Sequence, residues 1–477
     1  MTAKINLKIL LPVSLLVLLA GCQVFTGISS SAPTPSALLP LSGPQASKAG
    51  ASALMVYQNP TSIGVLLVPV NVSTGQPENG FAPVDFGSNE EHVFSADRGL
   101  LAFASTNTAA CQAKCLHVLD VRAWKETILP VKLSGNNTIW AVLAFNSQNT
   151  VVAVALNNPG DPGASGGQLL LVDLSQNRII QQMQFSANVE QMGFTPSGSL
   201  AVYGSLPPAA GQESKMNVAL YDGSSLQTLW SQDLDEISYG NEFGVESSDP
   251  SQGRFLSPAA VFSHDHARLY VVAADKPVLV SVDFASQTVQ STDIHPRQGF
   301  LERLLTAGVG VAYAKAMNGA IKTGALSPDG KTMYIVGQTY TAVKDQAGGW
   351  TSQVASLGLL VVDLSDGTEA GTLATEATDV HLSLDGKTIL LTGYGQSNSG
   401  SSQPWTYLAD AATLKVTRRL GSEIVPSRLL NGSQALLSLI WADSGPNHLA
   451  IYDPTLLNLL SQHEGTTQDY AAWVPIP

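Results

Sequence analysis

A short β-rich run that ends in aspartate recurs along the chain and constrains the fold more than any other feature. An asparagine or aspartate at a strand end accepts hydrogen bonds from its own backbone two residues on, so each run predicts a strand leading into a tight turn. The spacing of about 50 residues is that of a repeated supersecondary unit. The runs end at Asp120, Asp173, Asp222, Asp283, Asp363, Asp410 and Asp453, and an eighth, LLVPVN, ends at Asn71.

A second recurring element, a turn followed by a strand, precedes these runs. It occurs as SADRGLLAFAS from Ser95, SHDHARLYVVA from Ser263 and SPDGKTMYIVG from Ser327. Its apolar residues alternate with polar ones or run continuously over short stretches, and nothing in it has helical periodicity. The complete unit is therefore four strands joined by turns and one variable loop, which is the blade of a β-propeller.

The repeats resemble the YVTN-type β-propeller family, as in LYVVAADKPVLVSVDFASQTV from Leu269, and are WD40-like without the Gly-His or Trp-Asp signature. The resemblance covers nearly all of residues 52–477. It implies an all-β fold with a single propeller of four-stranded blades over that range. It implies no activity, because propellers of this build serve as enzymes, receptors and scaffolds.

The two ends of the repeat region predict how the ring closes. The first unit, which starts at Ala53, lacks its innermost strand, whereas the tail from Asp469 to Pro475 is a lone strand. We expect the tail to supply the missing strand, which leaves no free sheet edge. This arrangement gives eight blades, with seven as the alternative.

The N-terminus predicts export and lipidation. Lys4 and Lys8 precede an acid-free apolar run, Ile9 to Ala20, that is too short to span a bilayer comfortably. The residues Leu19-Ala20-Gly21-Cys22 resemble the bacterial lipobox. By that resemblance residues 1–21 are a signal peptide, and Cys22 becomes the first mature residue and carries acyl chains such as palmitate. The alternative is an ordinary signal peptide that happens to contain Cys22.

The segment after the proposed anchor, residues 22–51, is rich in Ser, Pro and Ala and predicts a flexible tether. The formal charge of -13 becomes -15 when residues 1–21, with two lysines and no acid, are removed. Such an acidic body has no electrostatic attraction for nucleic acid. We expect a monomeric protein outside the cytoplasm, lipid-anchored to a membrane of the bacterial cell envelope.

The long loops predict one binding face. In a propeller, the loop between the second and third strands of a blade opens on the same face as the connection between blades. The long segments 157–168, 205–215, 339–358, 393–404, 234–258 and 295–323 all fall there, and loops on a rigid scaffold are where binding usually occurs. Their aromatic residues either contact a partner or pack their own loops. These candidate contact residues are Tyr239, Phe243, Phe255, Phe300, Tyr340, Trp350 and Trp405.

The two cysteines after the anchor, Cys111 and Cys115, favour a local disulfide in an oxidising compartment over a metal site completed by His117. The triplet His264-Asp265-His266 suggests a metal site, but its alignment with the turn at Ser327 favours a solvated turn. Asp233, Asp235 and Glu236 are weak calcium candidates because their spacing fits no EF-hand loop.

Other motifs carry little chemistry. Gly163 to Gly167 matches G-x-S-x-G in a Gly and Pro loop, without the strand and helix that a nucleophile elbow requires. Lys315 and Lys322 lie in an insertion and are either solvated or near the central funnel.

Two functions therefore stand, neither with a cofactor that the sequence demands. The first, favoured by the anchor and the one-sided loops, is a binding or scaffold module for a protein or glycan of the envelope. The second is a lactonase-like hydrolase with a site at the central funnel, assembled from scattered residues and accompanied by calcium. A convergence of histidines and carboxylates at the funnel mouth would favour the enzyme.

Overall fold

A computed structural model of the chain places its strands in a β-propeller. It describes residues 52–58, 65–71, 76–78, 80–87, 91–105, 115–130, 140–157, 167–185, 187–206, 214–242, 254–295, 319–344, 350–396, 402–429, 434–440, 448–453, 458–464 and 470–474. All of these belong to the second of two units, Leu41–Pro477. The predicted signal peptide, Cys22 and the tether lie outside the described residues.

The described residues form strands and turns and contain no helix. Accordingly, no helix among them is long and apolar enough to cross a membrane. The all-β class predicted from the repeats is confirmed, because the strands pair in ladders that are antiparallel with one exception among the described strands, β17 with β22.

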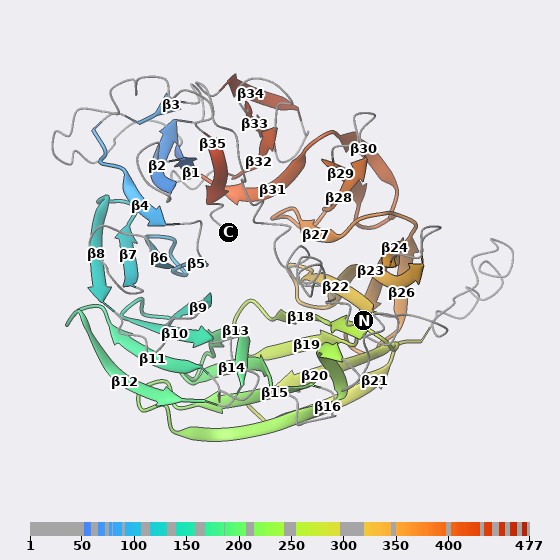
Figure 1. Cartoon of the computed structure of the whole chain (residues 1–477), viewed down its shortest axis with the longest axis horizontal. Coiled ribbons are helices and arrows are strands. Elements are labelled where there is room, and N and C mark those ends of the chain that lie inside the picture. The colour runs from blue at the N-terminus through green and yellow to red at the C-terminus, as the bar shows by residue number, and fades with distance from the viewer. Residues whose placement is uncertain are drawn as a thin grey trace, which may run out of the picture. The chain divides into compact units, whose positions relative to one another are not determined.

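Five sheets are separate blades of four antiparallel strands, and Figure 1 shows the first strand of each facing the middle of the ring. The first comprises β5 (His92–Phe94), β6 (Leu100–Ser105), β7 (Cys115–Asp120) and β8 (Lys125–Pro130), and the second β9 (Trp140–Phe145), β10 (Val151–Asn157), β11 (Gln168–Asp173) and β12 (Arg178–Gln184). The third comprises β18 (Ala259–Phe262), β19 (Arg268–Val272), β20 (Val278–Asp283) and β21 (Thr288–Asp293). The others are β27 (Asp379–Leu382), β28 (Thr388–Gln396), β29 (Ser402–Asp410) and β30 (Val416–Leu420), and β31 (Glu423–Arg428), β32 (Gln434–Ile440), β33 (His448–Tyr452) and β34 (Leu459–Glu464).

A five-stranded sheet joins the two ends of the repeat region. It contains β1 (Ser52–Gln58), β2 (Val65–Asn71), β3 (Gln76–Pro77), β4 (Val84–Gly87) and the last strand, β35 (Tyr470–Val474). β35 pairs antiparallel with β1, with Leu54 opposite Val474 and Val56 opposite Ala472. The predicted pairing of the tail with the first unit is therefore present.

The ten-stranded sheet is the main departure from the expected set of eight, or seven, separate blades. Its strands are β13 (Asn188–Phe194), β14 (Leu200–Ser205), β15 (Ser214–Tyr221), β16 (Thr228–Glu242), β17 (Arg254–Ser257), β22 (Gly319–Leu326), β23 (Thr332–Lys344), β24 (Trp350–Ser356), β25 (Leu359–Asp363) and β26 (Glu369–Leu373). β17 pairs with the end of β16 and, in parallel, with β22. Two groups of strands that the sequence predicts as separate blades are thus joined by backbone hydrogen bonds.

Several segments predicted as long loops are strands. The range 234–258 contains the end of β16 and all of β17, because Gly240 to Glu242 pair with Arg254 to Leu256. Within 339–358, β23 continues past its blade and pairs with β24. A segment that extends past its blade needs partners for its backbone N–H and C=O groups. The extension of β16 pairs with β17 and that of β23 with β24, which accounts for both.

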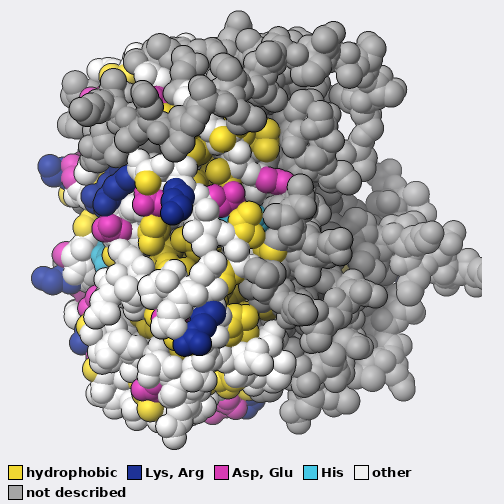
Figure 2. Space-filling model, turned by 90° about the vertical axis from the view of Figure 1, so that its left-hand side faces the viewer, with side chains coloured by type: hydrophobic (Ala, Val, Ile, Leu, Met, Phe, Trp, Pro, Cys, Tyr) yellow, Lys and Arg dark blue, Asp and Glu magenta, His cyan; other side chains and the backbone are white. Residues whose placement is uncertain are grey.

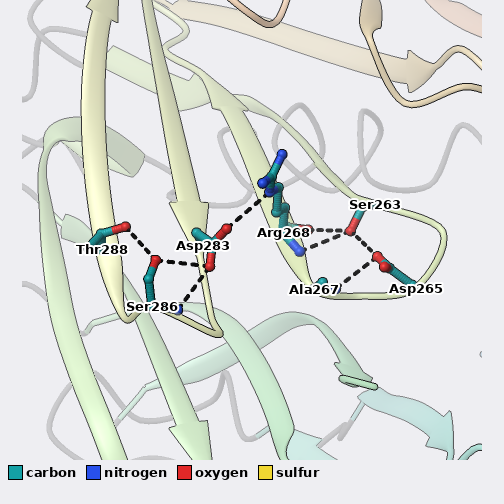
Figure 3. Close-up of polar contacts among 7 residues, drawn as sticks. All are labelled: Ser263, Asp265, Ala267, Arg268, Asp283, Ser286 and Thr288. Carbon is teal, nitrogen blue, oxygen red and sulfur yellow. Dashed lines mark hydrogen bonds and ion pairs between the residues drawn. The ribbon is translucent and has the colours of Figure 1, made fainter. Parts of the chain in front are cut away.

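The turn between the first two strands of a blade is held by a serine and an aspartate (Figure 3). Ser263 donates its hydroxyl hydrogen bond to Asp265 at 2.7 Å, and the backbone N–H of Arg268 donates to Ser263 Oγ at 2.9 Å. The same pair occurs at Ser95 and Asp97, Ser327 and Asp329, and Ser383 and Asp385. Asp265 therefore acts as a turn residue, as its alignment with the turn at Ser327 indicated.

Six of the recurring strand-end aspartates close their turns as predicted. Asp283 accepts hydrogen bonds from the backbone N–H and the hydroxyl of Ser286, each at 3.0 Å, and from Arg268 Nε at 3.1 Å (Figure 3). The backbone N–H of Ser286 is the largest influence that lowers the pKa of Asp283. Equivalent bonds close the turns after Asp120, Asp173, Asp222, Asp363 and Asp410.

The core lies between neighbouring blades. Leu116 and Val118 of β7 pack with Val152 and Val154 of β10, and farther round the ring Leu390 of β28 packs with Ile424 and Leu436. Both faces of these sheets are covered, so the central strands read as nearly continuous apolar runs. Figure 2 shows Lys, Arg, Asp and Glu side chains intermixed on the coloured part of one side of the molecule, with no extended basic patch there.

Candidate functional site

A histidine and a carboxylate meet at the start of the inner strand β27. Asp379 is its first residue and His381 its third, so strand alternation puts both side chains on one side of the strand. His381 Nε2 lies 3.1 Å from Asp379 Oδ2. Val380, on the other side, is only 2% exposed and belongs to the apolar core, which fixes the orientation of the strand.

Neighbouring strands bring a second acid and a phenol to this pair. Glu423 is the first residue of the next inner strand, β31, and it is hydrogen-bonded to the hydroxyl of Tyr394 on β28. On the preceding inner strand, β22, Thr323 donates to Thr378 O at 3.0 Å and is also hydrogen-bonded to Asp379. We call Asp379, His381, Tyr394 and Glu423 the inner-strand cluster.

The inner-strand cluster is accessible although protein surrounds it. The side chains of His381 and Asp379 are 36% and 44% exposed, and Tyr394 is 38% exposed. The innermost strands of a propeller line its central channel, so groups at their ends face the channel. These side chains can therefore meet a ligand that approaches along the channel axis.

The four groups influence one another's protonation. Burial disfavours charge on both members of the His381 and Asp379 pair, but their hydrogen bond and mutual attraction raise the pKa of His381 and lower that of Asp379. Burial, followed by the charge of Asp379, raises the pKa of Glu423. Burial, followed by the charges of Glu423 and Asp379, raises the pKa of Tyr394 to about 12.

Chemically, the cluster is rich in hydrogen-bond acceptors. Asp379 and Glu423 offer carboxylate oxygens, while His381 and Tyr394 each add a polar group on a flat ring. No group of three or more His, Cys, Asp or Glu side chains in the described part of the chain is arranged to hold a metal ion. The arrangement suits an organic ligand that carries several hydroxyl groups.

A buried lysine lies on the neighbouring inner strand. Lys322 of β22 is 7% exposed, and its Nζ donates a hydrogen bond to the backbone oxygen of Ala273 at 2.6 Å. Burial lowers its pKa to about 8, although the charge of Asp275 opposes that shift. The sequence left this lysine either solvated or near the funnel, and the structure places it between blades.

The predicted contact residues fall into three groups. Trp405 is 4% exposed and packs 4.3 Å from the ring of Tyr407, so little of its surface is open to a partner. Tyr340, Phe255 and Tyr239 are half-buried, and the hydroxyl of Tyr340 donates to Gln338 Oε1 at 2.8 Å. Phe243, Phe300 and the side chain of Trp350 lie outside the described residues.

The weak calcium candidates have protein partners on the exposed strand β16. Asp235 is paired with Lys215 at 2.7 Å, and Asp233 accepts a hydrogen bond from Asn217 at 2.7 Å. Glu236 is paired with Lys276 of the next blade. These contacts use the three carboxylates to fasten β16 to its neighbours.

The cysteine region is described in part. Cys115, the first residue of β7, is disulfide-bonded. Cys111 lies outside the described residues, so its pairing with Cys115 stays a prediction. His117 Nδ1 lies 2.6 Å from Glu126 Oε1, and its ring stacks on Phe103.

Sequence reasoning missed the inner-strand cluster. The available signal was a polar residue at the start of an inner strand, as in DVHL from Asp379 and EIVPSR from Glu423. The length and position of the loops pointed to their aromatic residues instead. The four side chains come from two neighbouring repeats, and their proximity is a property of the ring.

No protein-family model matches the chain, and no curated protein matches its sequence. Among solved structures, dihydro-heme d1 dehydrogenase NirN in complex with DHE is similar at 15% identity and a TM-score of 0.52, covering 92% of this chain and 78% of that one. BamB from Moraxella catarrhalis is similar at 11% identity and a TM-score of 0.42, covering 79% of this chain and 88% of that one. The periplasmic gluconolactonase PpgL from Pseudomonas aeruginosa is similar at 13% identity and 0.40, covering 78% and 95%.

These neighbours include enzymes as well as BamB, and at such low identity the likeness extends to the fold alone. The chain is therefore an all-β protein with a propeller of four-stranded blades. Its function has to be argued from its own side chains.

Proposed function

We propose that this chain is an envelope-anchored β-propeller that binds a hydroxyl-rich ligand, a glycan of the cell envelope, at the inner-strand cluster. The single observation that carries the proposal is that Asp379, His381 and Glu423, from the start of two adjacent inner strands, meet one another and Tyr394 of β28. Sugar hydroxyls donate hydrogen bonds that carboxylates accept well, and charge-assisted hydrogen bonds are the stronger ones.

The propeller in this proposal has eight blades. The ten-stranded sheet is counted as two blades, β13 to β16 and β22 to β26, connected by β17. With the five separate sheets and the sheet that holds β1 and β35, this gives eight units. The pairing of β35 with β1 supports a ring closed by the C-terminal strand.

Glycan binding is tested with the full-length mature protein and two probes, chitohexaose and cellohexaose, by isothermal titration calorimetry. We expect one probe to bind and Asp379→Asn with Glu423→Gln to weaken binding at least about tenfold, since the site loses its charged acceptors and gains two NH2 donors where hydroxyl groups donate. Glu369→Gln, a half-buried acid on the outer strand β26, is the matched control. Wild-type protein that binds neither oligosaccharide contradicts the proposal.

A hydrolase is the second candidate, and the pairing of His381 with Asp379 favours it. A carboxylate that holds a histidine by hydrogen bonding orients its ring and raises its pKa, as general acid–base catalysis requires. New reducing ends or shorter products after incubation with either probe, lost in His381→Gln, would establish this function. If neither oligosaccharide is cleaved, the hydrolase is ruled out for these probes and the binding module is favoured.

The anchor is proposed at Cys22, supported by the resemblance of Leu19 to Cys22 to a lipobox. Two or more acyl chains hold a protein stably at a membrane, whereas one does not. We expect labelling with an alkyne analogue of palmitate in a bacterial host, and recovery in the membrane fraction. Cys22→Ser is expected to abolish both, and unchanged membrane recovery would contradict lipidation. Cys111→Ser serves as the control for labelling at another cysteine.

A further inference from the structure

A second polar cluster lies on a different blade and centres on Glu190 of the inner strand β13. In the pairing of β13 with β14, Val189 lies opposite Gly204 and Gln191 opposite Tyr203, so Glu190 is the extra residue of a β-bulge. Bulges redirect a side chain and are frequent beside functional sites. Here the bulge separates Glu190 from the regular alternation of its strand.

Two further strands supply hydroxyl groups to this carboxylate. Ser205 Oγ, at the end of β14, lies 3.2 Å from Glu190 Oε1. The hydroxyl of Tyr239 donates to Glu190 from the extended part of β16. The register between β15 and β16 shifts there, from Met216 opposite Leu234 to Lys215 opposite Ser238, so the strand bends before it reaches Tyr239.

A buried hydroxyl near this carboxylate is left without a partner. Tyr203 is 2% exposed, and its hydroxyl has no hydrogen-bond partner among the described residues. It is close enough to Glu190 and Tyr239 for their charges to raise its pKa, after burial as the main cause. An unsatisfied buried hydroxyl costs about 1–3 kcal/mol, so a group that bonds it is favoured.

No positively charged group in the described part of the chain acts on Glu190. The groups that act on Glu190 in the described structure are the Ser205 and Tyr239 hydroxyls, and neither is a cation. Burial raises the pKa of Glu190, whereas a bound cation would lower it again. Glu190 and Tyr239 are only half-buried, which leaves the carboxylate open to a ligand.

We propose that Glu190, Tyr203, Ser205 and Tyr239 form a separate binding site for a primary ammonium group. The ammonium donates hydrogen bonds to the Glu190 carboxylate and to the Tyr203 oxygen, which gives the unpaired Tyr203 oxygen a donor. Its charge balances Glu190, and its tetrahedral donors match acceptors that come from different strands. The site is independent of the inner-strand cluster, since the two share no residue.

A primary ammonium fits these four side chains better than a metal ion or a sugar hydroxyl does. Glu190 is the cluster's only carboxylate, and divalent cations in proteins collect several oxygen ligands, usually with more than one carboxylate. A neutral hydroxyl satisfies Tyr203 but leaves the charge of Glu190 uncompensated. The ligand class is thus an amine-bearing compound, such as an amino sugar or an amino-terminal peptide.

The test uses ethylammonium chloride as the probe and the full-length mature protein with tyrosine labelled at the hydroxyl-bearing carbon. Ethylammonium is expected to shift the NMR signals of Tyr203 and Tyr239 in a saturable manner at pH 7. The response should disappear in Glu190→Gln and weaken at least about fivefold in the conservative Tyr203→Phe, which removes the unpaired acceptor. Glu369→Gln is the matched control and should respond as wild type does.

Potassium chloride and the wild-type response provide the two outcomes that would overturn the ammonium site. An equal response to potassium chloride at the same concentration would show a site for any small cation and overturn the ammonium assignment. No saturable shift in wild-type protein would also overturn it, with folding of every variant checked by near-ultraviolet circular dichroism. Asp379→Asn should leave the ethylammonium response intact, so this site and the glycan site can fail separately.

Discussion

Deletion of residues 466–477 is expected to lower the melting temperature by on the order of 10 °C. The loss of one strand removes several kcal/mol of unfolding free energy, and each kcal/mol lost lowers the melting temperature by about 2 °C or more. The deletion removes β35, whose backbone pairs with β1 from Leu54 to Tyr57. The remaining β1 then presents unpaired N–H and C=O groups along one edge. Differential scanning fluorimetry measures the shift directly.

The physical reason is that β35 connects the last part of the chain to the first. The apolar contacts of Val68 and Val70 with Leu437 and Leu449 hold the first sheet against the last blade, but they cannot satisfy a sheet edge. An exposed edge also invites pairing between chains, so the truncated protein should aggregate on heating.

A point variant keeps this prediction testable if the truncated chain does not accumulate. Ala472→Pro places a residue without an N–H in β35, opposite Val56, and should give a smaller shift in the same direction. Deletion of residues 28–39 within the predicted tether is the control and should leave the melting temperature unchanged. A truncated protein that melts at the wild-type temperature would show that ring closure does not depend on this strand.

Stability is expected to rise by about 2 kcal/mol between about pH 7.5 and about pH 9.5 because of Lys322, and Lys322→Met should remove this rise. Burial lowers the pKa of Lys322 to about 8 in the folded protein, from its ordinary value of 10.5. Between these two values the unfolded chain binds more protons than the folded one. Folding therefore becomes more favourable as the pH increases through that interval, and below it the full cost of burying the charge is present.

Urea unfolding of wild type and Lys322→Met at several pH values measures the effect as a difference between two curves. Using the difference removes the contributions of other groups that titrate in this range. Lys387→Met, at a lysine whose side chain is 82% exposed, is the control. If the unfolding free energies of wild type and Lys322→Met change with pH in the same way, the pKa of Lys322 is not lowered in the folded protein and the prediction is wrong.

The turn chemistry was open to prediction because it is local. A serine or aspartate side chain accepts a hydrogen bond from a backbone N–H two to five residues away, and this bond does not depend on distant parts of the chain. Ser263 with Arg268 and Asp283 with Ser286 are examples. The recurrence of these residues at a fixed interval was enough to predict strands, turns and a propeller. The pairing of the C-terminal strand with the first repeat could also be predicted, because the first repeat lacked its innermost strand and the C-terminal strand belonged to no repeat.

The strand extensions were not predictable in the same way. The residues of β17 carry no distinctive pattern, and its parallel pairing with β22 links residues more than sixty positions apart. The bulge at Glu190 likewise depends on how β13 meets β14, since one shifted residue changes the direction of a side chain. A loop and a short strand such as β17 have similar residue patterns, so the sequence does not distinguish them.

The sequence by itself determined the fold class, the repeating unit and the tight turns, because each depends on residues that are neighbours in the chain. The anchor at Cys22 stays a prediction of the same local kind. Only the tertiary structure decided which polar side chains meet. Asp379 and Glu423 belong to different repeats and approach each other because their strands are adjacent in the ring. Glu190 and Tyr239 meet because one strand bulges and another extends beyond its blade, and such proximity leaves no periodic trace in a sequence.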